Sequence, residues 1–446
     1  MSSSVEQIKD KLDIVDTISS YIKVEKAGIN WKARCPFHNE KTASFFISKT
    51  RQSFYCFGCG EKGDIFSFVE KFEGLDFKGA LESLASRAGI ELKSFQKEDR
   101  KEIGEKERLF EIMEEAAKIY EGNLQTSKHI SDYLKNRGVE TSTITKWRLG
   151  FALEEWRSLF DRLSQKGFTK EEMLGAGLIK KVPQEGNAAQ PNVDSGRHYD
   201  TFRNRVMFPI SDSAGRVIAF SGRAMREDEK TPKYLNSPET KLFHKSEVLY
   251  GFHIAKNYIR KLDYTVLVEG QMDLLMSHQA GILNTVASSG TALTELHLQK
   301  IKKLSNKVLV AYDSDLSGEK AAIKAAELAL SLGMEAKIAS MPQGEDPAST
   351  VKENPEKWKN TLRNSEHLVD FALNKAFREH QGRNLTKEIV KSVLPIVSKI
   401  QSEIEKSQYA KKQRPARYSL KPAEFIQRKR HHYQKDRHDY GSERGG

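Results

Sequence analysis

Several features common in other protein classes are scarce or missing in this chain of 446 residues. It has no run of about 18 consecutive apolar residues, which a membrane-spanning helix requires. Its first residues lack the basic flank and apolar stretch of a secretion signal. It has only three cysteines, an odd number that does not complete a disulfide framework. These absences argue against a membrane protein and a disulfide-stabilised secreted domain, and we expect a cytoplasmic protein.

Positive charge, by contrast, is in excess. The chain has 73 Lys and Arg against 61 Asp and Glu, a formal net charge of +12. Such a balance favours a polyanionic partner, usually nucleic acid, although an ordinary basic protein can share it. More than half of the excess lies in residues 411–446, where 11 Lys and Arg face 4 Asp and Glu. This tail has few aliphatic residues, and we expect it to be disordered.

All three cysteines fall in one short stretch with metal-ligand spacing. Cys35 and His38 are separated by two residues, 17 residues follow, and Cys56 and Cys59 are again separated by two. Four nitrogen and sulfur donors presented from two tight turns suit tetrahedral Zn²⁺ and leave no position for water. The alternative is three buried thiols and an unrelated histidine. We expect one structural zinc ion per chain, bound by Cys35, His38, Cys56 and Cys59.

Aromatic and cationic residues alternate around these four. Stacking of bases on aromatic rings, with cations along the phosphates, is typical of single-stranded nucleic acid binding. The alternative is that the phenylalanines form the core of the small domain. The set comprises Trp31, Lys32, Arg34, Lys41, Phe45, Phe46, Lys49, Arg51, Phe54, Tyr55 and Phe57.

Residues 264–341 have the pattern of a parallel sheet. Short β-branched runs (YTVLVEG, LNTVASSG, KVLVAYD and EAKIASM) alternate with helical runs. This alternation predicts βαβ units, and the ligand site of such a sheet lies at the carboxyl ends of its strands.

Acidic residues follow these predicted strands. Glu269 and Asp273 follow the first, Asp313 and Asp315 a later one, and Asp346 the next. Carboxylates gathered at one sheet edge repel each other unless cations neutralise them, and oxygen ligands select Mg²⁺ or Mn²⁺. Two such ions can activate a hydroxyl and stabilise a leaving phosphate oxygen. The alternative, aspartates that only cap turns or helices, fits a lone DxD better than this combination.

Basic and amide side chains precede the acids. They suit the phosphates of a nucleotide or a template, although an ordinary basic face is an equally good reading for any one of them. The candidates are Arg203, Arg205, Arg223, Lys233, Asn236 and Lys245.

The motifs occur in the order found in one family, and the chain resembles bacterial replicative DNA primases over roughly residues 5–410. The resemblance rests on CPFH and CFGCG, FRNRVMFPI and GRVIAFSGR, KYLNSPET, VEGQMD, ASSGTALT, YDSDLSG and GEDP. It implies a multidomain α/β protein, with a zinc-ribbon-like domain, an α+β polymerase core containing a parallel βαβ TOPRIM subdomain, and a helical C-terminal segment.

The resemblance also implies a division of the chain and a function. The expected segments are a zinc-binding, DNA-binding domain (1–97), the first part of the core (107–262), the TOPRIM subdomain (263–345), a helical subdomain (346–410) and the basic tail (411–446). The implied activity is synthesis of short RNA primers from ribonucleoside triphosphates on single-stranded DNA, by a monomer at the replication fork. Glu269, Asp313 and Asp315 would be the central metal-binding acids, supported by Asp273 and Asp346.

Two departures from the family pattern stand out. The family often has an acid after GEDP, where this chain has Ala348; whether Glu345 compensates is open. The family also continues into a helicase-binding domain, whereas the resemblance here ends near Tyr409. We expect a truncated or frameshifted product, with a substitute nucleic-acid-binding tail as the alternative, and this puts the helicase partner in doubt.

Two other functions remain to be distinguished. One is another TOPRIM enzyme, such as a nuclease, or a topoisomerase, which would need a separate breakage domain. The other is a non-catalytic zinc protein that only binds nucleic acid.

Overall fold

The computed structural model describes residues 4–38, 40, 42–73, 75, 77–90, 97–181, 198–226, 232–290 and 292–412. These fall into two compact units, residues 1–365 and 366–446. No helix in the described ranges is both long and apolar enough to span a bilayer. Lys41, the polar segment 182–196 and most of the basic tail, from residue 413, lie outside the described residues.

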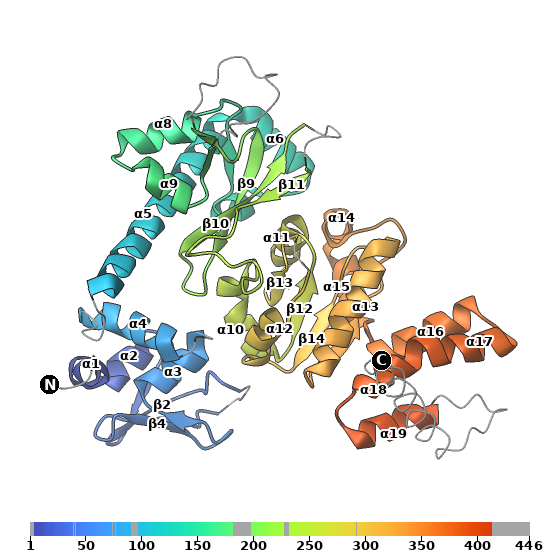
Figure 1. Ribbon diagram of the computed structural model, residues 1–446. Helices are drawn as coiled ribbons and strands as arrows, with labels where there is room; N and C mark the ends of the chain where they lie inside the picture. Colours follow the sequence, from blue (N-terminus) through green and yellow to red (C-terminus); the bar gives the residue numbers. More distant parts are fainter. Residues whose placement is uncertain are drawn as a thin grey trace, which may run out of the picture. The chain divides into compact units, whose positions relative to one another are not determined.

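The N-terminal part of the first unit is a five-stranded antiparallel sheet covered by helices, with the order β1-β2-β3-β4-β5 (Figure 1). Strand β3 shows why the sheet forms: Phe45 and Ile47 are buried, and Phe46 and Ser48 alternate with them. Helix α3 adds five buried apolar residues to the same core. The elements are α1 (Ser4–Lys11), α2 (Ile14–Ser19), β1 (Glu25–Ala27), β2 (Asn30–Ala33), β3 (Phe45–Ser48), β4 (Ser53–Cys56), β5 (Lys62–Gly63), α3 (Ile65–Glu73) and α4 (Phe77–Ala88).

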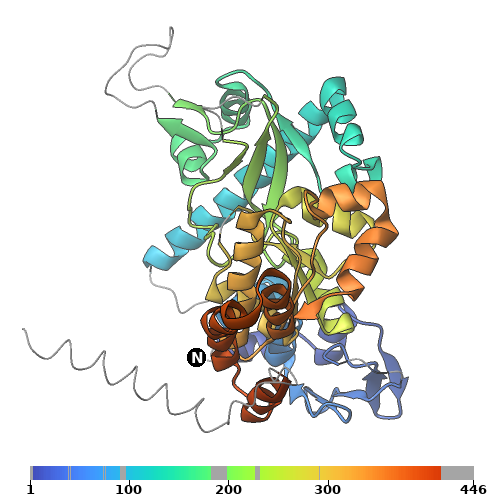
Figure 2. The ribbon, with the colours of Figure 1, turned by 90° about the vertical axis from the view of Figure 1, so that its right-hand side faces the viewer.

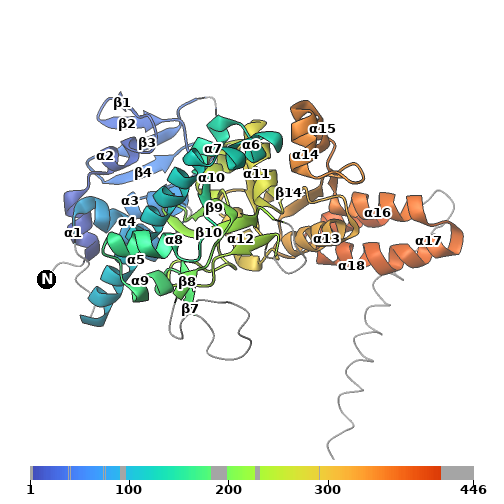
Figure 3. The same cartoon turned by 90° about the horizontal axis from the view of Figure 1, so that it is seen from above.

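A 30-residue helix, α5 (Lys97–Thr126), follows. Residues 97–106 are densely charged and form the beginning of this helix. Farther along, α5 packs on a second antiparallel sheet, where Tyr120 meets Phe220 edge to face at 5.2 Å (Figure 3).

The second sheet has the order β11-β10-β9-β6. Its two long strands lie side by side (Figure 2) and are joined by a tight turn at residues 212–216. All eight residues of β10 are buried, because the sheet is covered on both faces. The elements of this region are α6 (Lys128–Asn136), α7 (Thr141–Lys146), β6 (Gly150–Ala152), α8 (Ser158–Gln165), α9 (Lys170–Gly175), β7 (Ile179–Lys181), β8 (His198–Asp200), β9 (Arg205–Ser211), β10 (Val217–Ala224), β11 (Tyr234–Asn236) and α10 (Phe252–Leu262).

A buried carboxylate fixes the start of α8. Asp200 is 2% exposed, and its two oxygens accept the backbone N–H groups of Leu159 and Phe160 at 2.7 and 3.0 Å. Burial raises the pKa of Asp200 to about 7. The stabilising effect of this raised pKa is complete below the ordinary carboxyl pKa and is lost as the pH rises through about 7.

We therefore expect wild type and Asp200→Asn to differ in the pH dependence of unfolding. Between pH 5 and 8 the free energy of unfolding of the wild type should fall more steeply, by roughly 1–3 kcal/mol, because one pKa unit corresponds to about 1.4 kcal/mol. Urea unfolding at a series of pH values measures this. Asp132→Asn, an exposed aspartate on α6, is the control, and parallel profiles for wild type and Asp200→Asn would contradict the prediction.

The third sheet is parallel, as predicted. In the first unit its strands have the order β13-β12-β14-β15, and every one of these pairs is parallel. The carboxyl ends of β12 and β14, which are neighbours, come just before Glu269 and Asp313. The elements are β12 (Thr265–Val268), α11 (Gln271–Gln279), β13 (Thr285–Ala287), α12 (Glu295–Lys302), β14 (Lys307–Val310), α13 (Leu316–Ser331), β15 (Glu335–Ile338), α14 (Pro347–Glu353) and α15 (Pro355–Arg363).

The first unit extends to Ser365 and includes α14 and α15. The reason is that α14 packs against α11, so it belongs to the same compact body.

The second unit is mainly helical where it is described, with one short strand, β16. Its π-helical turn, η1, ends two residues before Pro395, which has no N–H and crowds the carbonyl four residues earlier. The elements are β16 (Glu366–His367), α16 (Leu368–Glu379), α17 (Gly382–Glu388), η1 (Ile389–Val393), α18 (Leu394–Lys399) and α19 (Glu403–Lys412).

Candidate metal centres

The sheet of the N-terminal region brings the four predicted zinc ligands together. One donor atom from each of Cys35, His38, Cys56 and Cys59 lies within 4.8 Å of all the others. Cys35 Sγ and Cys59 Sγ are 3.8 Å apart, as are Cys56 Sγ and His38 Nδ1. These separations match the edges of a tetrahedron with Zn–S bonds of about 2.3 Å, and they are too long for a disulfide bond of about 2.05 Å. The donor set therefore fits zinc.

Local backbone geometry explains the spacing. Cys56 ends β4, and the following turn returns Cys59 to the cluster. A Cβ atom at Gly58 would lie 2.5 Å from His38 Nε2, so any larger residue here would collide with the histidine ligand. Burial raises the pKa of the Cys35 thiol, and a cation is needed to hold it as a thiolate.

The aromatic residues around this centre divide between core and surface. Phe45 and Phe54 are buried, as the alternative reading of these residues held. Tyr55 and Phe57 are 42% and 71% exposed and meet edge to face at 4.8 Å. Phe46 packs on Phe57 from the neighbouring strand at 5.4 Å. The division follows from the alternation of side chains along β3 and β4.

At the parallel sheet, the carboxyl ends of two neighbouring strands present Glu269 and Asp313. Burial raises the pKa of Glu269 to about 7, and the charges of Asp313 and Asp315 add to the effect. Burial raises the pKa of Asp313 to about 6, with contributions from Asp346 and Asp315. The carboxylates are thus close enough to repel each other. In the described residues, however, they do not form a group as tight as the Cys-His cluster.

The other acids also hold helices in place. Asp315 caps α13, where its Oδ1 accepts the N–H of Gly318 at 2.6 Å, and this hydrogen bond lowers its pKa. Asp346 caps α14 in the same way through Ser349 N–H at 2.6 Å. A Cβ atom at Gly318 would lie 2.4 Å from the backbone oxygen of Asp313, so this strand-to-helix turn requires glycine.

Asp273 is buried and connects α11 to α14. Its oxygens accept the N–H groups of Gly270 and Ala348 at 3.1 and 3.2 Å. Burial and the charges of Asp313 and Asp346 raise its pKa to about 7. The methyl group of Ala348 packs in the hydrophobic core.

Glu345 already has two hydrogen-bond partners. Its Oε1 accepts a hydrogen bond from Lys357 Nζ at 2.7 Å and its Oε2 accepts one from Thr350 Oγ1 at 2.9 Å. The hydrogen bond from Lys357 is the main cause of its lowered pKa. Its charge is therefore already compensated within α14 and α15.

Two of the predicted basic residues have internal partners. Arg203 stacks on the ring of Trp156 at 3.8 Å and donates to the backbone oxygen of Asp200. Arg205 is buried and donates to the backbone oxygens of Gly222 and Pro232.

Arg223 and Lys233 differ in exposure: Arg223 is buried and Lys233 is exposed. Arg223 is buried, 5.5 and 5.9 Å from the ring centres of Tyr133 and Tyr234. The charge of Lys233 lowers the pKa of Asp313, which places this ammonium group near the acids.

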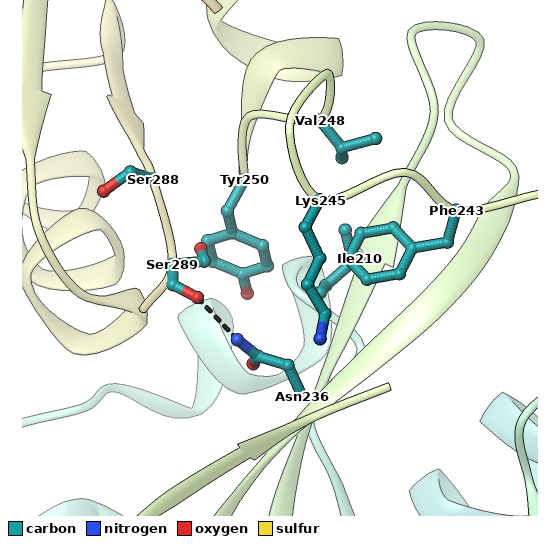
Figure 4. A pocket seen from close by; sticks show the side chains of 8 residues that line it. All are labelled: Ile210, Asn236, Phe243, Lys245, Val248, Tyr250, Ser288 and Ser289. Atoms are coloured by element: carbon teal, nitrogen blue, oxygen red, sulfur yellow. Dashed lines mark hydrogen bonds between the residues drawn. The ribbon is translucent and has the colours of Figure 1, made fainter. Parts of the chain in front are cut away.

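Asn236 and Lys245 line one small pocket, and in Figure 4 both side chains point into the same space. Asn236 donates to the backbone oxygen of Ser289 at 2.8 Å, so β11 is tied to the loop after β13. The remaining lining residues are Ile210, Phe243, Val248, Tyr250, Ser288 and Ser289.

One contact beside the acids had no signal in the sequence. Gln271 Nε2 donates to Ser221 Oγ at 2.8 Å, and both side chains are buried. This bond joins the first turn of α11 to β10, 50 residues earlier in the chain.

We expect Gln271→Ala to destabilise the first unit by about 1–3 kcal/mol, because it leaves the Ser221 hydroxyl buried without its donor. In a double-mutant cycle, Gln271→Ala with Ser221→Ala should cost less than the sum of the two single variants. Urea unfolding measures all four proteins. Gln299→Ala, whose side chain is exposed on α12, is the control, and strictly additive effects would contradict the coupling.

Three family models match the chain in sequence order. They describe a CHC2 zinc finger (residues 1–100), the N-terminal domain of the DNA primase catalytic core (119–256) and a Toprim-like domain (266–351). The first supports the structural zinc, and the last implies a divalent cation such as Mg²⁺.

Curated relatives agree with these matches. The DNA primase of Clostridium acetobutylicum is 37% identical over 413 residues, which cover 92% of this chain and 66% of the relative. That of Aquifex aeolicus is 37% identical over 380 residues, which cover 85% of this chain and 72% of the relative. Against the C. acetobutylicum and Pseudomonas putida enzymes the chain spans 66% and 60% of the relative's length.

Solved structures of DNA primases also match the chain. The zinc-binding and RNA polymerase domains of the Aquifex aeolicus primase match with a TM-score of 0.60 and 33% identity, over 92% of this chain and 96% of that one. A DnaG primase catalytic domain bound to single-stranded DNA matches with a TM-score of 0.59 and 31% identity, over 70% of this chain and 96% of that one. The predicted fold class is confirmed, and the chain belongs to the family of DnaG-type bacterial DNA primases.

Proposed function

We propose that the chain is a DNA-directed RNA polymerase that makes short RNA primers on single-stranded DNA. The observation that carries this proposal is that Glu269 and Asp313 come together at the carboxyl edge of the parallel sheet. Burial raises the pKa of both, and the charges of nearby acids add to the effect. A site that gathers repelling carboxylates favours divalent cations, and the basic side chains beside it favour phosphate.

In this proposal Glu269, Asp313 and Asp315 hold the divalent cations, while Asp273 and Asp346 support them by fixing α11 and α14. The cations would lower the pKa of the attacking 3′-hydroxyl and stabilise the departing pyrophosphate. The protein supplies mainly position and charge.

Lys233, Asn236 and Lys245 would orient the triphosphate of the incoming ribonucleotide. The guanidinium groups of Arg203, Arg205 and Arg223 would complete the basic side of the site; Arg203 and Arg205 also hold strand ends through backbone carbonyls. Exposed Tyr55 and Phe57 would stack on template bases, on a domain held by zinc at Cys35, His38, Cys56 and Cys59.

The domain division proposed on this basis has the zinc domain at 1–97, the first part of the core at 107–262, the TOPRIM subdomain from 263 and the helical subdomain up to 410. Helix α14 packs on α11, and α15 packs on α14. We propose that the protein acts as a monomer in the cytoplasm, at the replication fork. No described residue gives evidence for a helicase contact.

One assay separates this function from its rivals. The protein is incubated with single-stranded DNA, Mg²⁺ or Mn²⁺ and labelled ribonucleoside triphosphates. A primase yields short labelled RNA only when template and metal are both present. Degradation of the DNA with metal alone would indicate a nuclease, and DNA binding without any product would indicate a non-catalytic protein; either result overturns the proposal.

A further inference from the structure

Glu40 lies beside the zinc-ligand cluster but is not one of the four donors. Its side chain is 9% exposed. Its Oε1 accepts the backbone N–H of Cys35 at 2.5 Å and that of Ser44 at 3.2 Å. Its Oε2 accepts the hydroxyl of Ser44 at 2.5 Å. A carboxylate this well satisfied by short hydrogen bonds has one fixed orientation.

The same carboxylate faces one nitrogen of His38. Glu40 Oε2 lies 3.4 Å from Nε2, while the other ring nitrogen, Nδ1, is 3.8 Å from Cys56 Sγ. One nitrogen is thus directed to the donor cluster and the other to a carboxylate. A metal-bound histidine commonly donates its second N–H to such an acceptor, which fixes the tautomer and the ring orientation and increases the basicity of the ligating nitrogen.

Ser44 extends the network to a third ligand. Its hydroxyl, which donates to Glu40, also lies 3.2 Å from Cys56 Sγ. Glu40 therefore accepts the backbone N–H of Cys35, lies beside the ring of His38 and is linked to Cys56 through the hydroxyl of Ser44. An ordinary surface glutamate has no reason to be nearly buried beside three ligands of one cluster.

We propose that Glu40 is a positioning residue of the zinc centre: it holds His38 with Nδ1 toward the metal and fixes the turn that carries Cys35. This inference rests on the proposed zinc ligation by the four donors and adds a residue outside that set. Its negative charge is compensated by N–H and O–H donors, so the residue can stay close to a thiolate-rich site without binding the metal.

Two substitutions separate the roles of the carboxylate. Glu40→Gln keeps the size of the side chain and one acceptor oxygen for the N–H groups of Cys35 and Ser44. Its amide nitrogen would face Ser44 Oγ and His38 Nε2, where it can only donate. Glu40→Ala removes every contact. Glu25→Gln, at an exposed glutamate on β1 of the same sheet, is the matched control, and Cys59→Ser is the reference for loss of a ligand.

The measurement is the zinc dissociation constant of the full chain, by competition with a chromophoric chelator. We expect affinity to fall about 10-fold in Glu40→Gln and up to about 100-fold in Glu40→Ala, as for other residues that orient metal ligands. Glu25→Gln should stay within about twofold of wild type. The visible spectrum of the cobalt-saturated protein should also change in Glu40→Gln, because the orientation of His38 changes; a role in folding alone would leave the saturated spectrum unaltered.

The outcomes distinguish this inference from the zinc assignment beneath it. If wild type binds zinc, Cys59→Ser does not, and both Glu40 variants match Glu25→Gln in affinity and cobalt spectrum, the positioning role is overturned and the ligand set stands. If wild type and Cys59→Ser bind zinc equally weakly, the ligand assignment itself fails and the role of Glu40 fails with it.

Discussion

Replacing Asp313 with Asn is expected to abolish primer synthesis while the binding of single-stranded DNA persists. The loss should be about 10³-fold or more in initial rate, because a metal-holding carboxylate contributes several kcal/mol of transition-state stabilisation. Asn has nearly the same shape, so the fold of the parallel sheet should be kept. Labelled-ribonucleotide incorporation measures the rate, and fluorescence anisotropy measures DNA binding.

The same sheet offers a matched control at its opposite edge. Asp263 precedes β12 and pairs with Lys307, at the start of β14, at 2.7 Å. Because Asp263 adopts a left-handed backbone conformation (φ 57°) that Asn tolerates, Asp263→Asn should keep full activity. Comparable losses in both variants would show that the effect of Asp313→Asn is structural, and undiminished synthesis in Asp313→Asn would refute the catalytic role.

Without divalent cations, Asp313→Asn should make the fold more stable than wild type. Burial and neighbouring acids raise the pKa of Asp313 to about 6, so above that pH its ionised form opposes folding. In a chelator at pH 8, Asp313→Asn should therefore unfold at a higher temperature than wild type. Mg²⁺ or Mn²⁺ should stabilise wild type more than the variant. A catalytic residue whose removal stabilises the metal-free protein is difficult to explain as a structural residue.

The parallel sheet and its acids could be predicted because both follow from local patterns. β-branched runs give strands, and parallel connections bring their carboxyl ends to one edge. Glu269 and Asp313 lie within three residues of the ends of two neighbouring strands. The zinc cluster was predictable for the same reason: its two ligand pairs have fixed local spacing, and a single antiparallel sheet brings them together.

The remaining details depend on side chains that are far apart in the sequence. Nothing near Arg203 indicates that it stacks on Trp156, and nothing near Gln271 indicates Ser221, 50 residues earlier. Nothing near Glu345 indicates that it pairs with Lys357. Each of these pairs depends on how separate elements pack, which the local pattern does not specify.

The second large effect concerns the zinc domain. Cys56→Ser is expected to leave the chain with less than about a tenth of an equivalent of zinc and with residues 4–90 unfolded. Cys56 is fully buried at the end of β4, and its sulfur lies among donors from three other residues. Small zinc domains obtain most of their folding free energy from the metal, about 10–16 kcal/mol in zinc-finger peptides. Metal analysis and limited proteolysis measure the two effects.

The catalytic core should survive this substitution, because its hydrophobic clusters contain no residue of the zinc domain. We expect protease-resistant fragments beginning within α5, and template-directed synthesis reduced by about 10–100-fold through lost template stacking, since each stacked base contributes about 1–3 kcal/mol.

No cysteine outside the cluster exists for a matched control, so the paired comparison is His38→Ala against His129→Ala, an exposed histidine on α6. If His38→Ala retains zinc and domain structure as His129→Ala does, the metal is not what holds this domain together. If instead both Cys56→Ser and His38→Ala release zinc while residues 4–90 stay protected, the aromatic core around Phe45 and Phe54 suffices for folding, and zinc serves only to shape the surface that carries Tyr55 and Phe57.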